Sequence, residues 1–124
     1  MNKEIIKRRD VYWVDLGKTV GTEIRKIRPC IVISNNWLNS FNSRIIVIPL
    51  TTKPISFIPF HLEINFADKK STILPEQIRS ISKKRIKWEF GKLGEISPEI
   101  MREISKLIHI VCELEEEKKT SREA

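Results

Sequence analysis

The sequence contains few of the residues that build most catalytic centres. Of its 124 residues, only two are histidine and two are cysteine. His61 is expected on a strand face and His109 on a helix flank, and neither belongs to an HxH, an HExxH or a paired-carboxylate motif. GxSxG and GxxxxGK[ST] motifs are also missing. These absences argue against a metal site, a two-histidine ribonuclease, a serine hydrolase triad and nucleoside triphosphate chemistry.

The cysteines and the apolar runs are typical of the core of a soluble globular protein. Cys30 and Cys112 stand in apolar stretches without CxxC spacing, so both are predicted to be small buried side chains rather than metal ligands or a disulfide. The longest apolar runs, such as residues 45–50, are far shorter than the roughly 18 residues of a membrane-spanning helix. The first residues lack a signal-peptide pattern. We expect a cytoplasmic protein that does not interact with a membrane.

Charge is present in excess and is unevenly placed. The formal net charge is +7, and residues 1–112 hold 20 Lys and Arg against 11 Asp and Glu. Such a surface is suited to a polyanion such as a nucleic acid. The same charge is explained equally well if the protein is simply a soluble basic protein from a proteome rich in isoleucine and lysine.

The hydrophobic pattern predicts strands first and a helix last. The predicted strands cover residues 11–16, 27–34, 44–50, 60–66, 71–81 and 90–94. In residues 60–66 apolar side chains alternate with polar ones, so His61, Glu63 and Asn65 should face outward and Phe60 inward. The continuous apolar run in residues 44–50 is typical of a strand buried on both faces. Pro75 indicates an edge position or a bulge.

A single amphipathic helix is expected to close the domain. Ser97 is a good N-cap, Pro98 suits the first helical position, and apolar residues recur at spacings of three and four from Ile100 to Leu114. The order of elements predicts a mainly β fold, a small bent sheet or partly open barrel of five to seven strands with a C-terminal helix. We expect one domain over residues 1–114 and a charged, frayed tail over 115–124.

The most informative segment for function runs from Gly21 to the apolar residues 30–33. It contains a hydroxyl and a carboxylate in Thr22 and Glu23, followed by Arg28 at the head of a predicted strand. A loop with these groups can grip a phosphodiester, because the guanidinium donates in pairs to phosphate oxygens. From the residues alone, an ion pair between Arg28 and a surface carboxylate is the favoured interpretation.

Several segments in register carry a resemblance to a known family. Residues 10–16, 19–23, 28–35 and 47–52 in the first half, and residues 59–64, 74–81 and 91–93 with the closing helix in the second, resemble the MazF/PemK toxin family over about residues 8–114. The resemblance implies an SH3-like, CcdB-like barrel that forms a homodimer. It also implies a metal-independent, cofactor-free endoribonuclease that cleaves single-stranded RNA at short sequence motifs and is inhibited by a cognate antitoxin.

The resemblance assigns roles to individual residues. The family's catalytic arginine and threonine fall on Arg28 and Thr51, with Thr52 as the alternative position after Pro49. Glu23 is a second candidate for proton transfer, because arginine is a poor general base at neutral pH. The other predicted RNA-binding residues are Thr22, Arg25, Lys26, Lys53, Glu76, Gln77 and Arg79. On the first strand, either Tyr12 or Trp13 should be exposed, with base stacking or core packing as its role.

The sequence departs from the family pattern in three places. Arg9 stands where the family usually has glycine, so the turn before the first strand is expected to differ. Residues 24–27 are charged and β-branched where the family commonly has glutamine and glycines, which should affect base preference more than chemistry. Pro75 precedes Glu76 and Gln77 and affects how they are presented.

Two other functions compete with RNA cleavage. A basic SH3-like module could bind RNA or a protein without cutting, and a CcdB-like toxin would poison a topoisomerase. The ending Ser121-Arg122-Glu123-Ala124 lacks the Trp-Gly-Ile-like tail of that second class. Arg28 and Thr51 together favour cleavage over simple binding.

Overall fold

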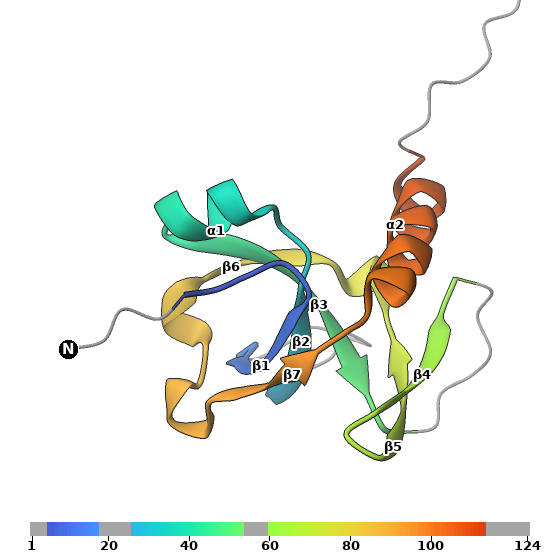
Figure 1. The fold of residues 1–124 in the computed structure, drawn as a ribbon, viewed down its shortest axis with the longest axis horizontal. Coiled ribbons are helices and arrows are strands. Elements are labelled where there is room, and N and C mark those ends of the chain that lie inside the picture. The colour runs from blue at the N-terminus through green and yellow to red at the C-terminus, as the bar shows by residue number, and fades with distance from the viewer. Residues whose placement is uncertain (1–4, 18–25, 54–59, 114–124) are drawn as a thin grey trace, which may run out of the picture.

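The computed structural model describes residues 5–17, 26–53 and 60–113, and its elements follow the predicted order (Figure 1). The strands are β1 (Asp10–Asp15), β2 (Ile27–Val32), β3 (Arg44–Thr51), β4 (Leu62–Phe66), β5 (Lys69–Ile73), β6 (Arg79–Ser82) and β7 (Lys92–Glu95). The α-helices are α1 (Asn36–Phe41) and α2 (Pro98–Cys112). Short 3-10 turns cover Pro75–Gln77, Lys83–Arg85 and Trp88–Phe90.

The strands form one curled antiparallel sheet in the order β4-β5-β3-β2-β1-β7, with β6 also paired to β3. β3 curls the sheet because it changes partners along its length: Arg44–Val47 pairs with β6, Val47–Pro49 with β2, and Leu50–Thr51 with β5. Figure 1 shows α2 beside the β4–β5 hairpin. The predicted small β barrel with a C-terminal helix is therefore confirmed as an open half-barrel.

The core has two parts, one on each face of the sheet. Ile45 and Val47 of β3 contribute to the first cluster, whereas Ile48 and Leu50 contribute to the second, which α2 covers with Met101 and Ile104. β3 is thus buried on both faces, as its apolar run predicts. α2 begins where predicted, because the Ser97 hydroxyl accepts a hydrogen bond from Ile100 N at 3.1 Å.

Three sequence predictions of local structure are wrong. The segment 71–81 is two strands rather than one, because Pro75 starts a 3-10 turn between β5 and β6. Phe60 is 39% exposed and the His61 side chain only 8%, because the alternating strand begins at Leu62. Cys112 is exposed at the end of α2, whereas Cys30 is fully buried as expected.

The helix α1 is absent from the predictions. Asn35 directly follows the predicted strand 27–34, and its side chain accepts from Leu38 N at 2.8 Å and caps the helix. Buried Asn39 then anchors the helix by donating to Ser34 O at 2.9 Å. A six-residue helix has little periodicity, so its sequence signal is the cap alone.

Among the described residues, no helix is long and apolar enough to cross a membrane. The predicted tail, residues 115–124, lies outside the described residues.

Candidate functional site

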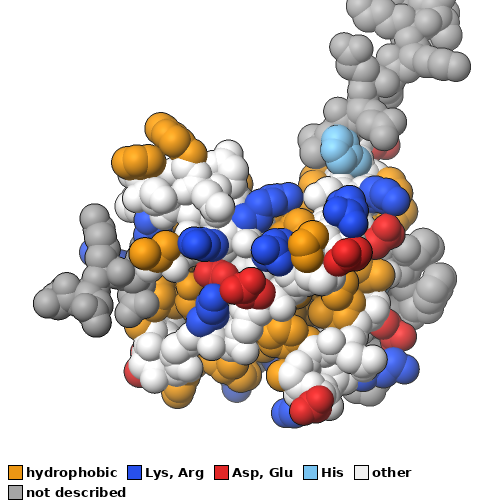
Figure 2. All heavy atoms as spheres, in the orientation of Figure 1, with side chains coloured by type: hydrophobic (Ala, Val, Ile, Leu, Met, Phe, Trp, Pro, Cys, Tyr) orange, Lys and Arg blue, Asp and Glu red, His pale blue; other side chains and the backbone are white. Residues whose placement is uncertain are grey.

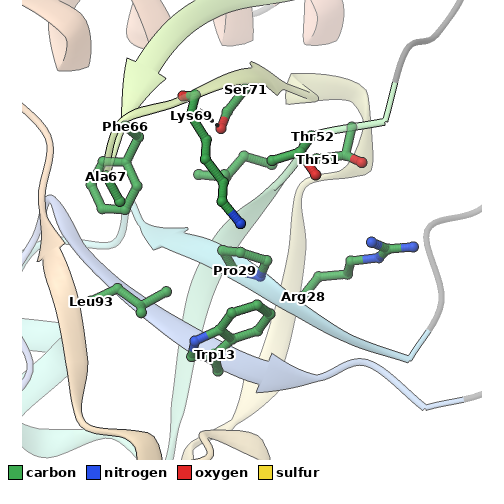
Figure 3. Close-up of a pocket in the computed structure, with 11 residues that line it drawn as sticks. Trp13, Arg28, Pro29, Thr51, Thr52, Phe66, Ala67, Lys69, Ser71 and Leu93 are labelled. Carbon is green, nitrogen blue, oxygen red and sulfur yellow. Dashed lines mark hydrogen bonds between the residues drawn. The ribbon is translucent and has the colours of Figure 1, made fainter.

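Arg28 and Thr51 are brought together at one end of the sheet. β2 and β3 pair with Cys30 opposite Pro49, so continuing this antiparallel register by two residues sets Arg28 across from Thr51. Both residues line a cavity of about 290 Å³ at the point where β2 begins and β3 ends (Figure 3). The arginine and the hydroxyl proposed from the sequence therefore share one site.

Among the described residues, the Arg28 guanidinium has a donor that is not occupied. The residue is half-buried, and its Nε is buried without a hydrogen-bond partner among the described residues. A buried donor without a partner costs about 1–3 kcal/mol, and a phosphate oxygen would recover that cost. No described carboxylate forms an ion pair with Arg28. In this part of the chain, the alternative of a surface ion pair finds no support.

Thr51 presents a fixed hydroxyl. The residue is 2% exposed, and its Oγ1 accepts a hydrogen bond from Lys53 N at 3.1 Å. Because that bond occupies a lone pair of the oxygen, the hydroxyl proton remains to be donated. Thr52 also lines the cavity but is exposed. The tight local turn gives Thr51 the better-defined hydroxyl of the two.

The other predicted RNA-binding residues are more dispersed. Glu76 lies in the 3-10 turn after β5 and contacts His61 Nε2 at 2.7 Å through Oε2, with Gln77 beside it. Arg79 starts β6 opposite Val47 and donates to Leu16 O at 3.3 Å. None of these three lines the cavity that contains Arg28.

The loop before β2 is described only at its end. Lys26 is exposed, with a φ of 66°, and its backbone is bonded to Gly17 O and Leu16 N. Lys53 directly follows the two threonines and is exposed. Thr22, Glu23 and Arg25, which carry three of the predicted roles, lie outside the described residues.

Burial makes Cys30 chemically quiet. The thiol is enclosed in the first core cluster, and burial raises its pKa to about 12, opposed in part by the positive charge of Arg79. The residue therefore stays a neutral thiol at physiological pH and is a poor nucleophile. Within the described ranges, no three His, Cys, Asp or Glu side chains gather where they could hold a metal ion.

The cavity also contains residues that the sequence predictions missed. Beyond the arginine and the threonines, it is lined by Trp13, Pro29, Leu50, Phe66, Ala67, Lys69, Ser71 and Leu93. Of these residues, only Trp13 could be suggested from the sequence, because it is an aromatic residue on the first predicted strand. Pro29 and Leu50 stand next to Arg28 and Thr51 on β2 and β3. The others come from the β4–β5 hairpin and β7, which are distant in sequence and reach β2 only because the sheet curls.

Comparisons with known proteins agree with this architecture. The family model described as "PemK-like, MazF-like toxin of type II toxin-antitoxin system" matches residues 7–112. The endoribonuclease MazF of Staphylococcus saprophyticus is 37% identical over 111 residues, which is 86% of this chain and 90% of that protein.

Solved structures share the fold at lower sequence identity. An endoribonuclease in complex with its cognate antitoxin, from a mycobacterial species, has a TM-score of 0.70 and 22% identity, with 91% of this chain and 98% of that chain covered. MazF from Deinococcus radiodurans has a TM-score of 0.72 and 16% identity, with 90% and 100% covered.

Proposed function

The chain belongs to the family of PemK-like, MazF-like toxins of type II toxin–antitoxin systems, and on that basis we propose that it is an endoribonuclease that cleaves single-stranded RNA. The observation that carries the proposal is the shared cavity of Arg28 and Thr51, with a buried guanidinium nitrogen that lacks a partner among the described residues. The Staphylococcus relative, which is named an endoribonuclease, supports the same activity.

The cleavage we propose uses the RNA's own 2′-hydroxyl. Its oxygen attacks the adjacent phosphorus, the bond from phosphorus to the 5′-oxygen breaks, and the products carry a 2′,3′-cyclic phosphate and a 5′-hydroxyl. One proton leaves the 2′-hydroxyl and another reaches the departing 5′-oxygen, so the step is balanced without a metal or a cofactor. Phosphorus passes through a pentacoordinate state with extra negative charge on its oxygens.

Arg28 and Thr51 are suited to stabilise that charge. The guanidinium can donate to two nonbridging oxygens at once, and Thr51 Oγ1 adds a neutral donor from the neighbouring strand end. Thr51 is held in place by Lys53 N, so its hydroxyl needs little reorganisation during the reaction. We assign proton transfer to Glu23 or to Arg28, and RNA contact to Thr22.

The proposal includes partners and a location. We expect a homodimer, because Ile110 on α2 is 53% exposed and Leu107 and Val111 beside it are only half-buried. A cognate antitoxin with an acidic segment would compete with RNA for the basic surface, as charge complementarity favours. RNA as substrate sets the site of action in the cytoplasm. We further propose that residues 1–114 form the functional unit.

The proposed activity is tested with purified protein and a long single-stranded RNA in EDTA. Arg28→Ala and Thr51→Ala should each lower the cleavage rate by about 10²–10³-fold, the usual effect of losing one donor to a developing negative charge. Thr52→Ala is the matched control and should retain most activity. The cleaved ends are analysed for 2′,3′-cyclic phosphate and 5′-hydroxyl groups.

Other results would point to other functions. RNA that is retarded on a gel but remains intact would favour the non-catalytic binding module. Growth arrest that follows topoisomerase inhibition, without RNA cleavage, would favour the CcdB-like poison. Full activity in Arg28→Ala would contradict the assigned roles, even if RNA is cut.

A further inference from the structure

The cavity beside Arg28 has an apolar half that the proposed chemistry does not use. Trp13, Pro29, Phe66 and Leu93 form its walls, and in Figure 3 the Arg28 guanidinium extends away from them. The volume of about 290 Å³ lies just below the range of roughly 300–1,000 Å³ that is typical of small-molecule sites. The space is therefore suited to a single ring system.

The cavity is lined by residues whose side chains project to different faces of the sheet. Side chains of a strand alternate between faces, so Arg28 projects to the face of Val14, its partner on β1, while Pro29 projects to the face of its partner Trp13. Residues of both kinds nevertheless line the one cavity, where β3 ends at Thr51. A nucleotide also has a charged part and an aromatic part, since its phosphate and its base are attached to different positions of the sugar.

The walls offer an aromatic surface, and Lys69 adds a cation that forms no ion pair with the carboxylates of the described residues. Trp13 is held from the outside by Phe90, whose ring centroid lies 6.4 Å away at an angle of 70°. Stacking of a base on such a side chain is worth about 1–3 kcal/mol. Phe66 can lie close to β7 because Gly94 has no side chain: a Cβ there would come within 3.1 Å of the Phe66 ring.

Lys69 adds a positive charge to this half of the cavity. The side chain is exposed, forms no ion pair with a described carboxylate, and directs its ammonium toward Pro29 in Figure 3. An ammonium group only donates hydrogen bonds, so it favours a base with a carbonyl oxygen and disfavours one that presents an amino group there. Lys70, the next residue, instead pairs with Glu63 at 3.8 Å.

We propose that this half of the cavity, defined by Trp13, Phe66, Lys69 and Leu93, holds the nucleobase next to the cleaved phosphodiester and selects guanine or uracil. Trp13 stacks on the base, and Lys69 donates to its carbonyl oxygen. The inference rests on the proposed function, since it assumes that Arg28 and Thr51 hold the phosphate. It assigns a specificity role to residues outside the proposed catalytic pair.

The first test measures base preference. An RNA pool randomised on both sides of the cut is digested, and the ends are sequenced for wild type, Lys69→Gln and Lys70→Gln. Lys69→Gln should reduce the preference for guanine or uracil at one position next to the cut by about tenfold, the effect of losing one charged hydrogen bond. Lys70→Gln is the matched control and should leave the profile unchanged. Identical profiles for both variants would overturn the role of Lys69.

The second test does not require cleavage. Binding is measured with an RNA that carries a single 2′-deoxy nucleotide at the cut, with the neighbouring base either present or removed. Removing the base should weaken binding to wild type by about tenfold or more, but should have little effect on Trp13→Leu, which keeps an apolar wall without a stacking surface. If base removal weakened binding to Trp13→Leu as much as binding to wild type, the two changes would be additive and the base pocket would be disproved.

The two tests separate the two proposals. A protein that does not cut RNA, but that loses affinity when the base is removed and depends on Trp13 for this loss, would refute the endoribonuclease and keep the pocket. A protein that cuts RNA in an Arg28-dependent way, with no effect of Lys69 or Trp13 on base choice or binding, would keep the endoribonuclease and refute the pocket.

Discussion

At the scale of single residues, side chains that are close in sequence differ in burial and in their contacts. Cys30 is sealed in the first core cluster, whereas Arg28, two residues earlier on the same face, lies at the rim with a nitrogen that lacks a partner among the described residues. Thr51 is buried and fixed by Lys53 N, but Thr52 is exposed. The position along the strand, more than residue type, decides whether a side chain serves the core or the site.

The two cysteines should differ sharply in reactivity. In the folded protein at pH 8, a thiol reagent should modify one thiol per chain, the exposed Cys112, and should reach Cys30 only after unfolding. Because burial raises the Cys30 pKa to about 12, its contribution to stability is complete below about pH 9, the usual thiol range, and is lost as the pH rises toward 12.

The alkaline part of this prediction is checked by denaturant unfolding. Between pH 9 and 11, the free energy of unfolding of wild type should fall more steeply than that of Cys30→Ala, by up to about 1.4 kcal/mol per pH unit. Cys112→Ala should behave like wild type. Equal slopes for wild type and Cys30→Ala would show that the thiol is not protected in the folded state.

At the scale of elements, the turn before β1 contains a positive backbone φ at Arg9, a conformation that residues other than glycine rarely adopt. Asp10 N donates to Lys7 O at 3.0 Å, and Arg9 takes a φ of 83° in this turn. A positive φ of this size is a conformation that favours glycine, so Arg9 adopts it under strain. The Arg9 side chain compensates by donating from NH1 to Ile96 O at 2.7 Å.

Substitutions at Arg9 should separate backbone strain from the side-chain bond. Arg9→Ala loses the bond to Ile96 O and keeps the positive φ, whereas Arg9→Gly loses the bond but relieves the strain. We expect the glycine variant to be more stable than the alanine variant by about 1 kcal/mol, measured by urea unfolding. Similar stabilities would mean that the turn rearranges when the side chain is removed.

At the scale of the whole molecule, the uneven charge should determine how RNA binds. The net charge is +7, and Figure 2 shows Lys and Arg side chains spread over the visible face of the body. Each phosphate contact to a single strand contributes a slope of about −0.7 in the logarithm of affinity against the logarithm of salt concentration. RNA affinity should therefore fall steeply with salt.

A single charge change checks whether Arg79 belongs to this surface. Arg79→Gln should make the salt slope shallower by about 0.7, because one phosphate contact is lost. Lys106→Gln is the matched control, since Lys106 pairs with Glu103 at 3.3 Å on the exposed side of α2 and should leave the slope unchanged. If the salt slope of Arg79→Gln were unchanged, Arg79 would not contact a phosphate, and its role would be only the structural hydrogen bond to Leu16 O.

The sequence by itself determined the periodic elements and the family. β3 was predicted because its apolar run is continuous, and α2 because its apolar spacing and the Ser97–Pro98 cap agree; both are local patterns. The short helix α1 and the break at Pro75 were missed because a single turn has little periodicity, and because the energy of a cap or a proline depends on the backbone around it.

Only the tertiary structure decided which residues share the cavity. Arg28 and Thr51 could be paired from the resemblance, but Phe66, Lys69 and Leu93 meet Trp13 only because β3 changes partners and curls the sheet. No local pattern records such a contact, since it arises between strands that are distant in sequence. The sequence therefore identified the chemistry proposed for the site, and the curvature of the sheet determined the pocket beside it.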